Sequence, residues 1–353
     1  MYEEKMKSLA DYYKEIIKNC DHWNYYDNQY FSYNKLKNID NECIGFLISY
    51  LGKGGKEDLP IFKYIYKIEE KRVRHIVSVF FLGMILYHNN SILQKYIKKY
   101  LLKYPQRNET EEQRFAYLWM LICLFHDNGY AVENGEINVS QDDFKTYYKK
   151  FPKNIGLPRL YSKKVLKRYY KYKECKRGQK DHGIVCGLKI YTDLCDLREE
   201  KEKVDTSHYW GKELEKDFAI ISWIIACHNI FFIDENDINF KCYTCKKLDK
   251  FIRKESDSYP ISIKAHPIFF LFCLVDSIEP IKVFDNIDAL ENIHCDIASM
   301  KFDFSKICFD KGVEYENKVL GLKKWLVNVS IENVVGKRVV HVNLNSSTAN
   351  SLL

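Results

Sequence analysis

The stretch FAYLWMLICLFHDNGY, residues 115–130, indicates both the fold class and the chemistry of this chain. Its first part, Phe115 to Phe125, is apolar throughout, which is typical of a helix buried in a protein core. His126 and Asp127 follow at once, so a ring nitrogen and a carboxylate stand together at the end of that helix. Both groups are ligands of divalent transition metals. The stretch therefore predicts a mainly α-helical protein with the beginning of a metal site.

Four further residues extend this pair to a set of six. His75, His182, His228 and Asp276 each lie within or at the end of another apolar segment, and the intervals between successive ligand positions are 51, 56, 46 and 48 residues. Each interval has room for one helix, a turn and the start of the next helix. Helix bundles build metal sites from side chains on facing helices. The spacing therefore predicts five helices that bring one or two ligands each to a common centre.

Each ligand position also has a purely structural alternative. A histidine on an apolar helix is more often a hydrogen-bonded core residue than a ligand. Asp276 is an exception, because it stands inside LFCLVDSIEP (271–280) and a buried carboxylate without a cation is costly. Glu133 is a candidate for a supporting role. Glu279 and Lys282 either orient a ligand and contact phosphate, or form a surface pair.

These motifs resemble those of the HD superfamily of metal-dependent phosphohydrolases. The resemblance covers residues 70 to 285. The matching stretches are RHIVSVFFLGMIL (74–86), LICLFHDNGY (121–130), DHGIVCGLKIY (181–191), ISWIIACHN (221–229) and LFCLVDSIEPIK (271–282). The last one is similar to the closing motif of bacterial HD hydrolases that cleave diadenosine tetraphosphate. No Gly-Tyr-Pro follows the HD pair, so the cyclic di-GMP phosphodiesterase branch is not implied. Asn229 stands where several two-metal members carry a second histidine.

The resemblance implies an HD-type helical bundle that binds one or two divalent transition-metal ions, of Fe, Mn, Co or Ni. The implied ligands of one ion are His75, His126, Asp127 and Asp276, and those of a second ion are His182 and His228, with Asp127 bridging. A metal-activated hydroxide would then hydrolyse a nucleotide or another phosphate ester. Asp127, His182 and His228 are the implied catalytic residues. The alternative function is a binding module that keeps the HD pocket to sense a nucleotide or nucleic acid.

A basic segment lies directly before His182. The chain has 55 Lys and Arg against 48 Asp and Glu, a formal charge of +7, and residues 163–180 contain nine basic residues and a single acid, Glu174. Such a run is either a solvated helix face or a contact for phosphates. Its position next to a ligand favours phosphate contacts, with nucleic acid as a candidate partner. The predicted substrate-binding residues are Lys163, Lys164, Lys167, Arg168, Asn229 and Lys282.

The pattern along the chain predicts three segments. Residues 1–60 form a helical extension that ends in the Gly-rich stretch LGKGGKEDLP. Residues 61–298 form the HD domain, with the basic insertion at about 131–180. Residues 299–353 form a small β-containing element, because apolar and polar residues alternate there, with a turn expected over 332–337.

Local signals place the ends of two helices. Asp181 is predicted to cap the helix that begins at His182, and Pro267 to stand in the first turn of the helix that carries Asp276. The helix around His75 shows apolar residues at the spacing of one buried face. These residues are Ile76, Val79, Phe80, Met84 and Tyr87.

The N-terminus lacks the basic-then-apolar pattern of a signal peptide, which predicts a cytoplasmic protein whose 12 cysteines are reduced. No membrane contact is expected, because the longest apolar run, residues 218–233, is short and contains His228. Cys242 and Cys245 form a CxxC pair without a second pair at zinc spacing. We interpret them as two free thiols.

Overall fold

The structure of the chain is a computed structural model, and it confirms a mainly α-helical protein with a small antiparallel sheet. It describes residues 6–25, 31–37, 42–59, 70–104, 110–136, 138–177, 180–253, 261–307, 313–327, 329–334 and 337–344. The longer helices are α1 (Leu9–Lys18), α3 (Glu42–Lys53), α5 (Glu70–Asn89), α6 (Ser91–Leu101), α7 (Glu111–Phe125), α9 (Gln141–Lys150), α10 (Lys163–Arg177), α11 (His182–Val204), α12 (Leu214–Cys227) and α14 (Pro267–Ile278). The shorter ones are α2 (Tyr33–Lys37), α8 (Tyr130–Glu133), α13 (Phe240–Cys245), α15 (Ile281–Phe284) and α17 (Val313–Gly321).

The chain divides into two compact units. The first consists of Met1–Phe46, Glu69–Ala116 and Tyr259–Leu353, and the second of Leu47–Ile68 and Tyr117–Ser258. This division does not follow the three predicted segments, since residue 298 lies inside the first unit. The basic insertion belongs to the second unit and contains α8, α9 and α10.

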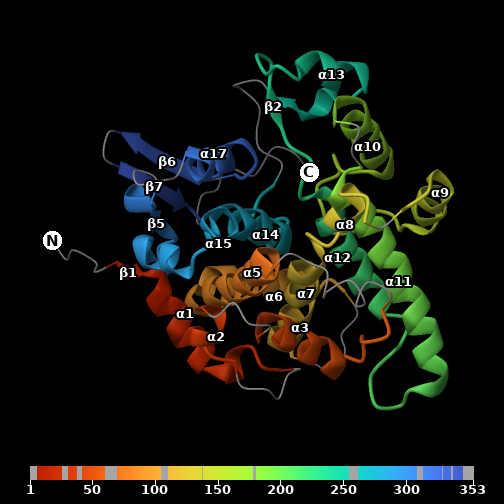
Figure 1. The fold of residues 1–353 in the computed structure, drawn as a ribbon, viewed down its shortest axis with the longest axis horizontal. Coiled ribbons are helices and arrows are strands. Elements are labelled where there is room, and N and C mark those ends of the chain that lie inside the picture. Colours follow the sequence, from red (N-terminus) through yellow and green to blue (C-terminus); the bar gives the residue numbers. More distant parts are fainter. Residues whose placement is uncertain are drawn as a thin grey trace. The chain divides into compact units, whose positions relative to one another are not determined.

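Helix α5 forms the core of the first unit and packs against α1, α6, α14 and α15 (Figure 1). Every residue from Val73 to Tyr87 is buried. The prediction of a single buried face on this helix is therefore wrong. Neighbouring helices cover α5 on several sides, and a helix with apolar residues all round is typical of such a central position. Each fully buried Val, Ile or Phe contributes roughly 1.5–3 kcal/mol of hydrophobic stabilisation.

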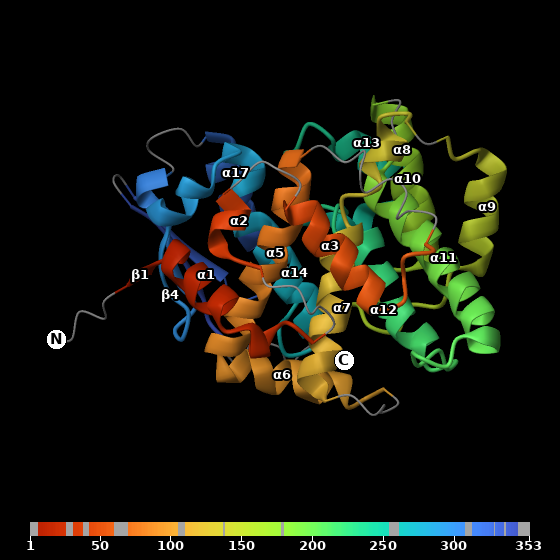
Figure 2. The same cartoon turned by 60° about the horizontal axis from the view of Figure 1, so that its bottom comes forward.

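The sheet of the first unit has the strand order β1-β4-β5-β7-β6, and all neighbouring strands are antiparallel. The strands are β1 (Lys7–Ser8), β4 (His294–Asp296), β5 (Lys301–Asp303), β6 (Val329–Val334) and β7 (Lys337–Val342). Figure 2 shows β1 and β4 next to α1. The alternating pattern correctly predicted β5, β6 and β7. The register ends with Val334 opposite Lys337, so the connection is shorter than the predicted turn.

The second unit is organised around the pair α11 and α12, which pack along each other (Figure 1). Two glycines of α11 allow this close approach. A Cβ atom at Gly187 would lie 2.5 Å from the backbone oxygen of Ser222, and one at Gly183 would lie 2.9 Å from Cε1 of His228. Contacts this short exclude any larger side chain without movement of α12. The strands β2 (Ile233–Asp234) and β3 (Ile252–Arg253) add a short parallel pair.

Both predicted helix starts are confirmed. The Asp181 carboxylate accepts a hydrogen bond from the Ile184 N–H at 2.9 Å, which caps α11. Pro267 is the first residue of α14. Among the described residues no single helix is long and apolar enough to cross a membrane, and α5 with α6 reaches that length only across a bend of 102°.

Candidate metal centre

The second unit brings three buried ligand residues together. Asp127, His182 and His228 each offer one ligand atom, and these atoms lie within 4.8 Å of one another. Asp127 Oδ1 is 4.0 Å from Nε2 of His182 and 3.4 Å from Nε2 of His126. Imidazole nitrogen with carboxylate oxygen is a donor set that suits Fe, Mn, Co or Ni better than Mg, which prefers oxygen ligands alone. The residues therefore fit a divalent transition metal.

His126 and His228 are oriented in the same way by the helices that they follow. Nδ1 of His126 lies 2.7 Å from the carbonyl oxygen of Cys123, and Nδ1 of His228 lies 2.6 Å from that of Ile225. The last carbonyls of a helix have no partner within the helix, so a histidine just after the end can donate back to one of them. A carbonyl only accepts, which places the ring proton on Nδ1 and leaves the lone pair of Nε2 for a metal.

His182 is oriented by a carboxylate instead. Its Nδ1 lies 2.6 Å from Oε2 of Glu133 at the end of α8. Burial raises the pKa of the Glu133 carboxyl, but the hydrogen bond and the charge interaction with His182 lower it by more, so its pKa is below the usual value. The ring of Tyr130 stacks on His182, with 3.8 Å between the ring centroids. Glu133 therefore orients the His182 ring, and its supporting role at a metal centre stays a prediction.

Asn229 contacts the other side of the His182 ring. Its Nδ2 lies 2.6 Å from Nε2 of His182, and its backbone oxygen accepts a hydrogen bond from Tyr169 Oη at 2.6 Å. The amide therefore occupies the lone pair that a metal ion would use. A metal can bind His182 through Nε2 only after this amide has moved aside.

A glycine makes the approach of α8 to His182 possible. A Cβ atom at Gly129 would lie 2.1 Å from the backbone oxygen of His182, closer than any side chain permits. The motif His-Asp-Asn-Gly-Tyr thus contains a candidate ligand pair, a close contact and the stacking ring of Tyr130. The sequence pattern alone does not indicate a role for Gly129, Tyr130 or Tyr169.

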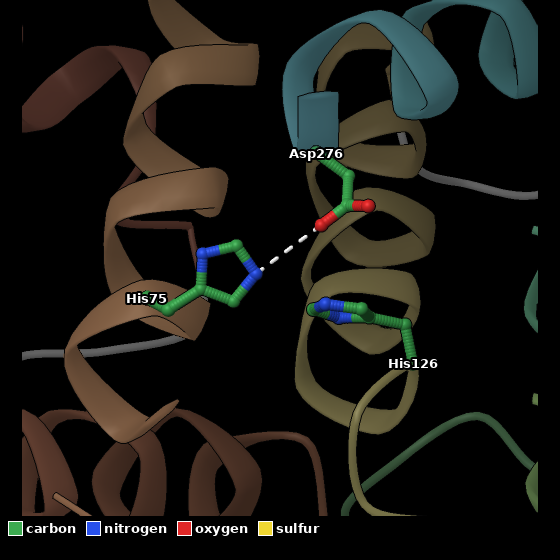
Figure 3. Close-up of side chains that lie close together, drawn as sticks. All are labelled: His75, His126 and Asp276. Atoms are coloured by element: carbon green, nitrogen blue, oxygen red, sulfur yellow. Dashed lines mark ion pairs between the residues drawn. The ribbon is translucent and has the colours of Figure 1, made fainter. Parts of the chain in front are cut away.

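In the first unit, His75 of α5 lies between two carboxylates. Figure 3 shows its Nε2 directed at Oδ1 of Asp276 on α14, at 3.2 Å. Its Nδ1 is 2.5 Å from Oε2 of Glu279. Burial and the charge of Lys282 lower the pKa of His75, but Glu279 and Asp276 raise it by more, so the net shift is upward.

Glu279 is fully buried, so the alternative of a surface pair with Lys282 is wrong. Its carboxylate also accepts hydrogen bonds from Ser78 Oγ at 2.7 Å and from the Ile281 N–H at 2.9 Å. Burial raises its pKa, but His75 and Ser78 lower it by more. Glu279 thus orients His75 as Glu133 orients His182.

The sequence predicted that Asp276 needs a metal as its counter-charge, but the structure places a lysine beside it. The Asp276 side chain is 19% exposed, and Lys318 Nζ lies 3.9 Å from its Oδ1. Lys318 also donates a hydrogen bond to the backbone oxygen of Asp276. A lysine of α17, far along the chain, thus supplies a cation that the sequence pattern does not reveal.

Of the four predicted phosphate contacts on α10, two donate to backbone oxygens and two are exposed. Lys163 Nζ donates to the Phe151 oxygen at 2.8 Å, and Arg168 Nη1 donates to the Lys247 oxygen at 3.1 Å. Lys164 and Lys167 are exposed.

With 3.6 residues per turn, Lys167 lies on the opposite side of α10 from Tyr169, which contacts Asn229. A substrate role for these basic residues, and for the half-buried Lys282, stays a prediction.

Comparisons with family models, with curated proteins and with solved structures find no match to this chain. The resemblance to the HD superfamily thus rests on the motifs. Independently of it, the chain contains four buried histidines and one buried aspartate that could bind a metal ion. They are His75, His126, Asp127, His182 and His228.

Proposed function

We propose that the protein is a metal-dependent phosphohydrolase or phosphodiesterase of the HD type, which hydrolyses a nucleotide or another phosphate ester. One observation carries the proposal. His126, His182 and His228 all have Nδ1 fixed by an acceptor, and the set lies beside the buried carboxylate of Asp127. Imidazole nitrogens and a carboxylate oxygen that lie within 4.8 Å of one another form a donor set that suits a divalent transition metal.

Asp127, His182 and His228 hold one ion in the second unit. The family resemblance adds His75, His126 and Asp276 and implies one or two ions in total. When bound, a divalent transition metal lowers the pKa of a bound water to about 7 and so supplies hydroxide at neutral pH.

The chain's own residues orient the ligands and bind the substrate. Glu133 keeps the proton of His182 on Nδ1, and Glu279 holds the ring of His75. The amide of Asn229, once it has left His182, is placed to donate to a phosphate oxygen. Lys282 and the basic residues of α10 remain candidates for further phosphate contacts. A higher KM after Lys164→Gln together with Lys167→Gln would support that role for α10.

The alternative is a module that senses a nucleotide or nucleic acid and has lost turnover. The contact between Asn229 and His182 favours this alternative, because it closes one ligand position. The two functions differ in whether bound nucleotide is hydrolysed.

The deciding experiment is a hydrolysis assay after metal-free purification and reconstitution with Mn or Fe. The substrates are dinucleoside polyphosphates, cyclic nucleotides and nucleoside triphosphates. Phosphate or nucleotide release by the wild type and not by Asp127→Asn would support the enzyme. Tight nucleotide binding without release would support the sensing module. Metal content well below one ion per chain under both conditions would refute both, since each retains the metal pocket.

A further inference from the structure

Positive charge is concentrated in two segments of the second unit. Residues 163–177, which form α10, contain eight basic residues and one acid, a formal charge of +7. Residues 240–250, which form α13 and the turn after it, contain four lysines and one aspartate, a formal charge of +3. The whole chain carries +7, so all other residues together carry −3. The two segments therefore hold more positive charge than the protein as a whole.

The lysines of α10 line up on its outer face. Lys164, Lys167 and Lys171 are exposed and recur at intervals of three and four residues, the spacing of one side of a helix. Among the described residues no ion pair joins any of the three to a carboxylate. The single acid of α10, Glu174, accepts a hydrogen bond from Gln141 at 3.2 Å. Like charges in a row repel one another, and Lys167 Nζ of this row lies over the Tyr148 ring, 5.9 Å from its centroid.

Helix α13 continues the same surface. Figure 1 shows α10 and α13 side by side, and a half-open pocket of about 180 Å³ lies between them. The pocket is lined by Tyr172, Cys175, Lys176, Lys241, Cys242, Cys245 and Lys246. Arg168 connects the two segments through its hydrogen bond to the Lys247 oxygen. We call the surface formed by residues 163–177 and 240–250 the basic surface.

We propose that the basic surface binds the phosphodiester backbone of single-stranded nucleic acid, without reading its sequence. Lysines that repeat along a helix match a polymer whose charges also repeat, and each contact releases bound counterions from the nucleic acid. The pocket between the helices adds a hollow with a tyrosine and three lysines. The row of Lys164, Lys167 and Lys171 lies on the face of α10 opposite Tyr169, and none of the pocket residues is a proposed metal ligand, so this binding site is distinct from the proposed metal centre.

The test is the binding of a fluorescein-labelled single-stranded RNA of mixed sequence, measured by fluorescence polarisation over a range of salt concentrations. Wild type should bind, with affinity falling linearly in log salt. The variant Lys171→Ala/Lys241→Ala/Lys246→Ala should bind at least about tenfold more weakly, and its salt slope should be smaller by about 2, because each lost contact to a single strand contributes about 0.7.

The matched control is Lys95→Ala/Lys98→Ala/Lys99→Ala on α6. It removes the same charge from three exposed lysines of the other unit, and it should bind RNA like wild type. Equal weakening of both triple variants would mean a general charge effect and would overturn the proposal. Stronger binding of wild type to phosphatidylserine vesicles than to RNA would overturn it in favour of a membrane surface.

Three free thiols report on the pocket directly. Cys175, Cys242 and Cys245 are exposed, whereas Cys20 is half-buried in the first unit. Saturating RNA should slow their alkylation by iodoacetamide, measured by mass spectrometry, and leave that of Cys20 unchanged. Unchanged alkylation of the three pocket thiols would refute binding at this place. Asp127→Asn should still bind RNA, so a failure of the proposed hydrolysis leaves this test intact.

Discussion

The carboxylate of Glu133 accepts a hydrogen bond from Nδ1 of His182, with 2.6 Å between the two atoms. The two residues are on different helices, α8 and α11, and Gly129 provides the close approach that brings them together. The bond selects the ring tautomer that leaves Nε2 for a metal. Outer carboxylates of this kind typically change metal affinity by a factor of about 10 to 100.

Glu133→Gln should therefore weaken metal binding about tenfold or more, because the amide keeps the shape and loses the charge. Competition with a chromogenic chelator measures the affinity. The control is Glu136→Gln, an exposed position three residues further along, which should bind metal like wild type. Equal affinities in the two variants would remove Glu133 from the metal centre.

Asp127→Asn should lower hydrolysis by orders of magnitude and reduce the metal content found by elemental analysis. The metal-free form should be as stable as wild type or more stable, because a buried carboxylate is strained without its cation. Asp181→Asn is the matched change at a helix cap, where Asn caps nearly as well as Asp, so its activity should persist. Full activity in Asp127→Asn would place the chemistry elsewhere.

Gly187→Ala should lower the free energy of unfolding by about 1–3 kcal/mol, because the new methyl group would meet the Ser222 backbone oxygen at 2.5 Å. Gly45→Ala in α3 is the opposite case, since no atom lies within 4 Å of its added Cβ. That change should raise the free energy of unfolding by about 0.5–1 kcal/mol through helix propensity. Urea unfolding of both variants checks the pair, and a stable Gly187→Ala would contradict the tight α11–α12 contact.

His88 should make the protein less stable as the pH falls from 6.5 to 4. Burial lowers its pKa to about 4, although its hydrogen bond to the His22 oxygen acts in the other direction. In this window the unfolded chain binds the proton and the folded protein does not, so stability present above pH 6.5 is lost on acidification.

Between pH 7 and pH 5 the loss due to His88 should be about 1–2 kcal/mol, allowing for its partial exposure. His88→Gln should reduce this difference, whereas His294→Gln, at an exposed position of β4, should leave it unchanged. Urea unfolding at the two pH values measures it. An equal loss in wild type and His88→Gln would exclude His88 as the cause.

Local sequence signals predicted helix ends and strands correctly. The cap at Asp181, the start at Pro267 and the alternation of β6 and β7 all involve residues a few positions apart, so the chain alone encodes them. The strands β1 and β4 were missed, because Lys-Ser and His-Cys-Asp contain at most one apolar residue and show no alternation of apolar and polar residues.

Contacts between distant segments could not be predicted. Lys318 near Asp276, and Cys175 in a pocket with Cys242, depend on how separate helices pack. The sequence allowed two interpretations of Glu279, as a residue that orients a ligand or as part of a surface pair, and only its burial distinguishes them. Residue type and order thus predicted the histidines and carboxylates of the candidate centre, whereas tertiary packing determined their partners.

The two faces of helix α10 differ in what they contact. Tyr169 on the inner face holds Asn229, which in turn covers His182, while the lysines are on the outer face. Any polymer that shifts α10 on binding would change how readily Asn229 leaves the ring. Thermodynamic reciprocity then requires that metal loading alter the affinity for the polymer by the same factor. RNA titrations with and without Mn would measure that coupling free energy.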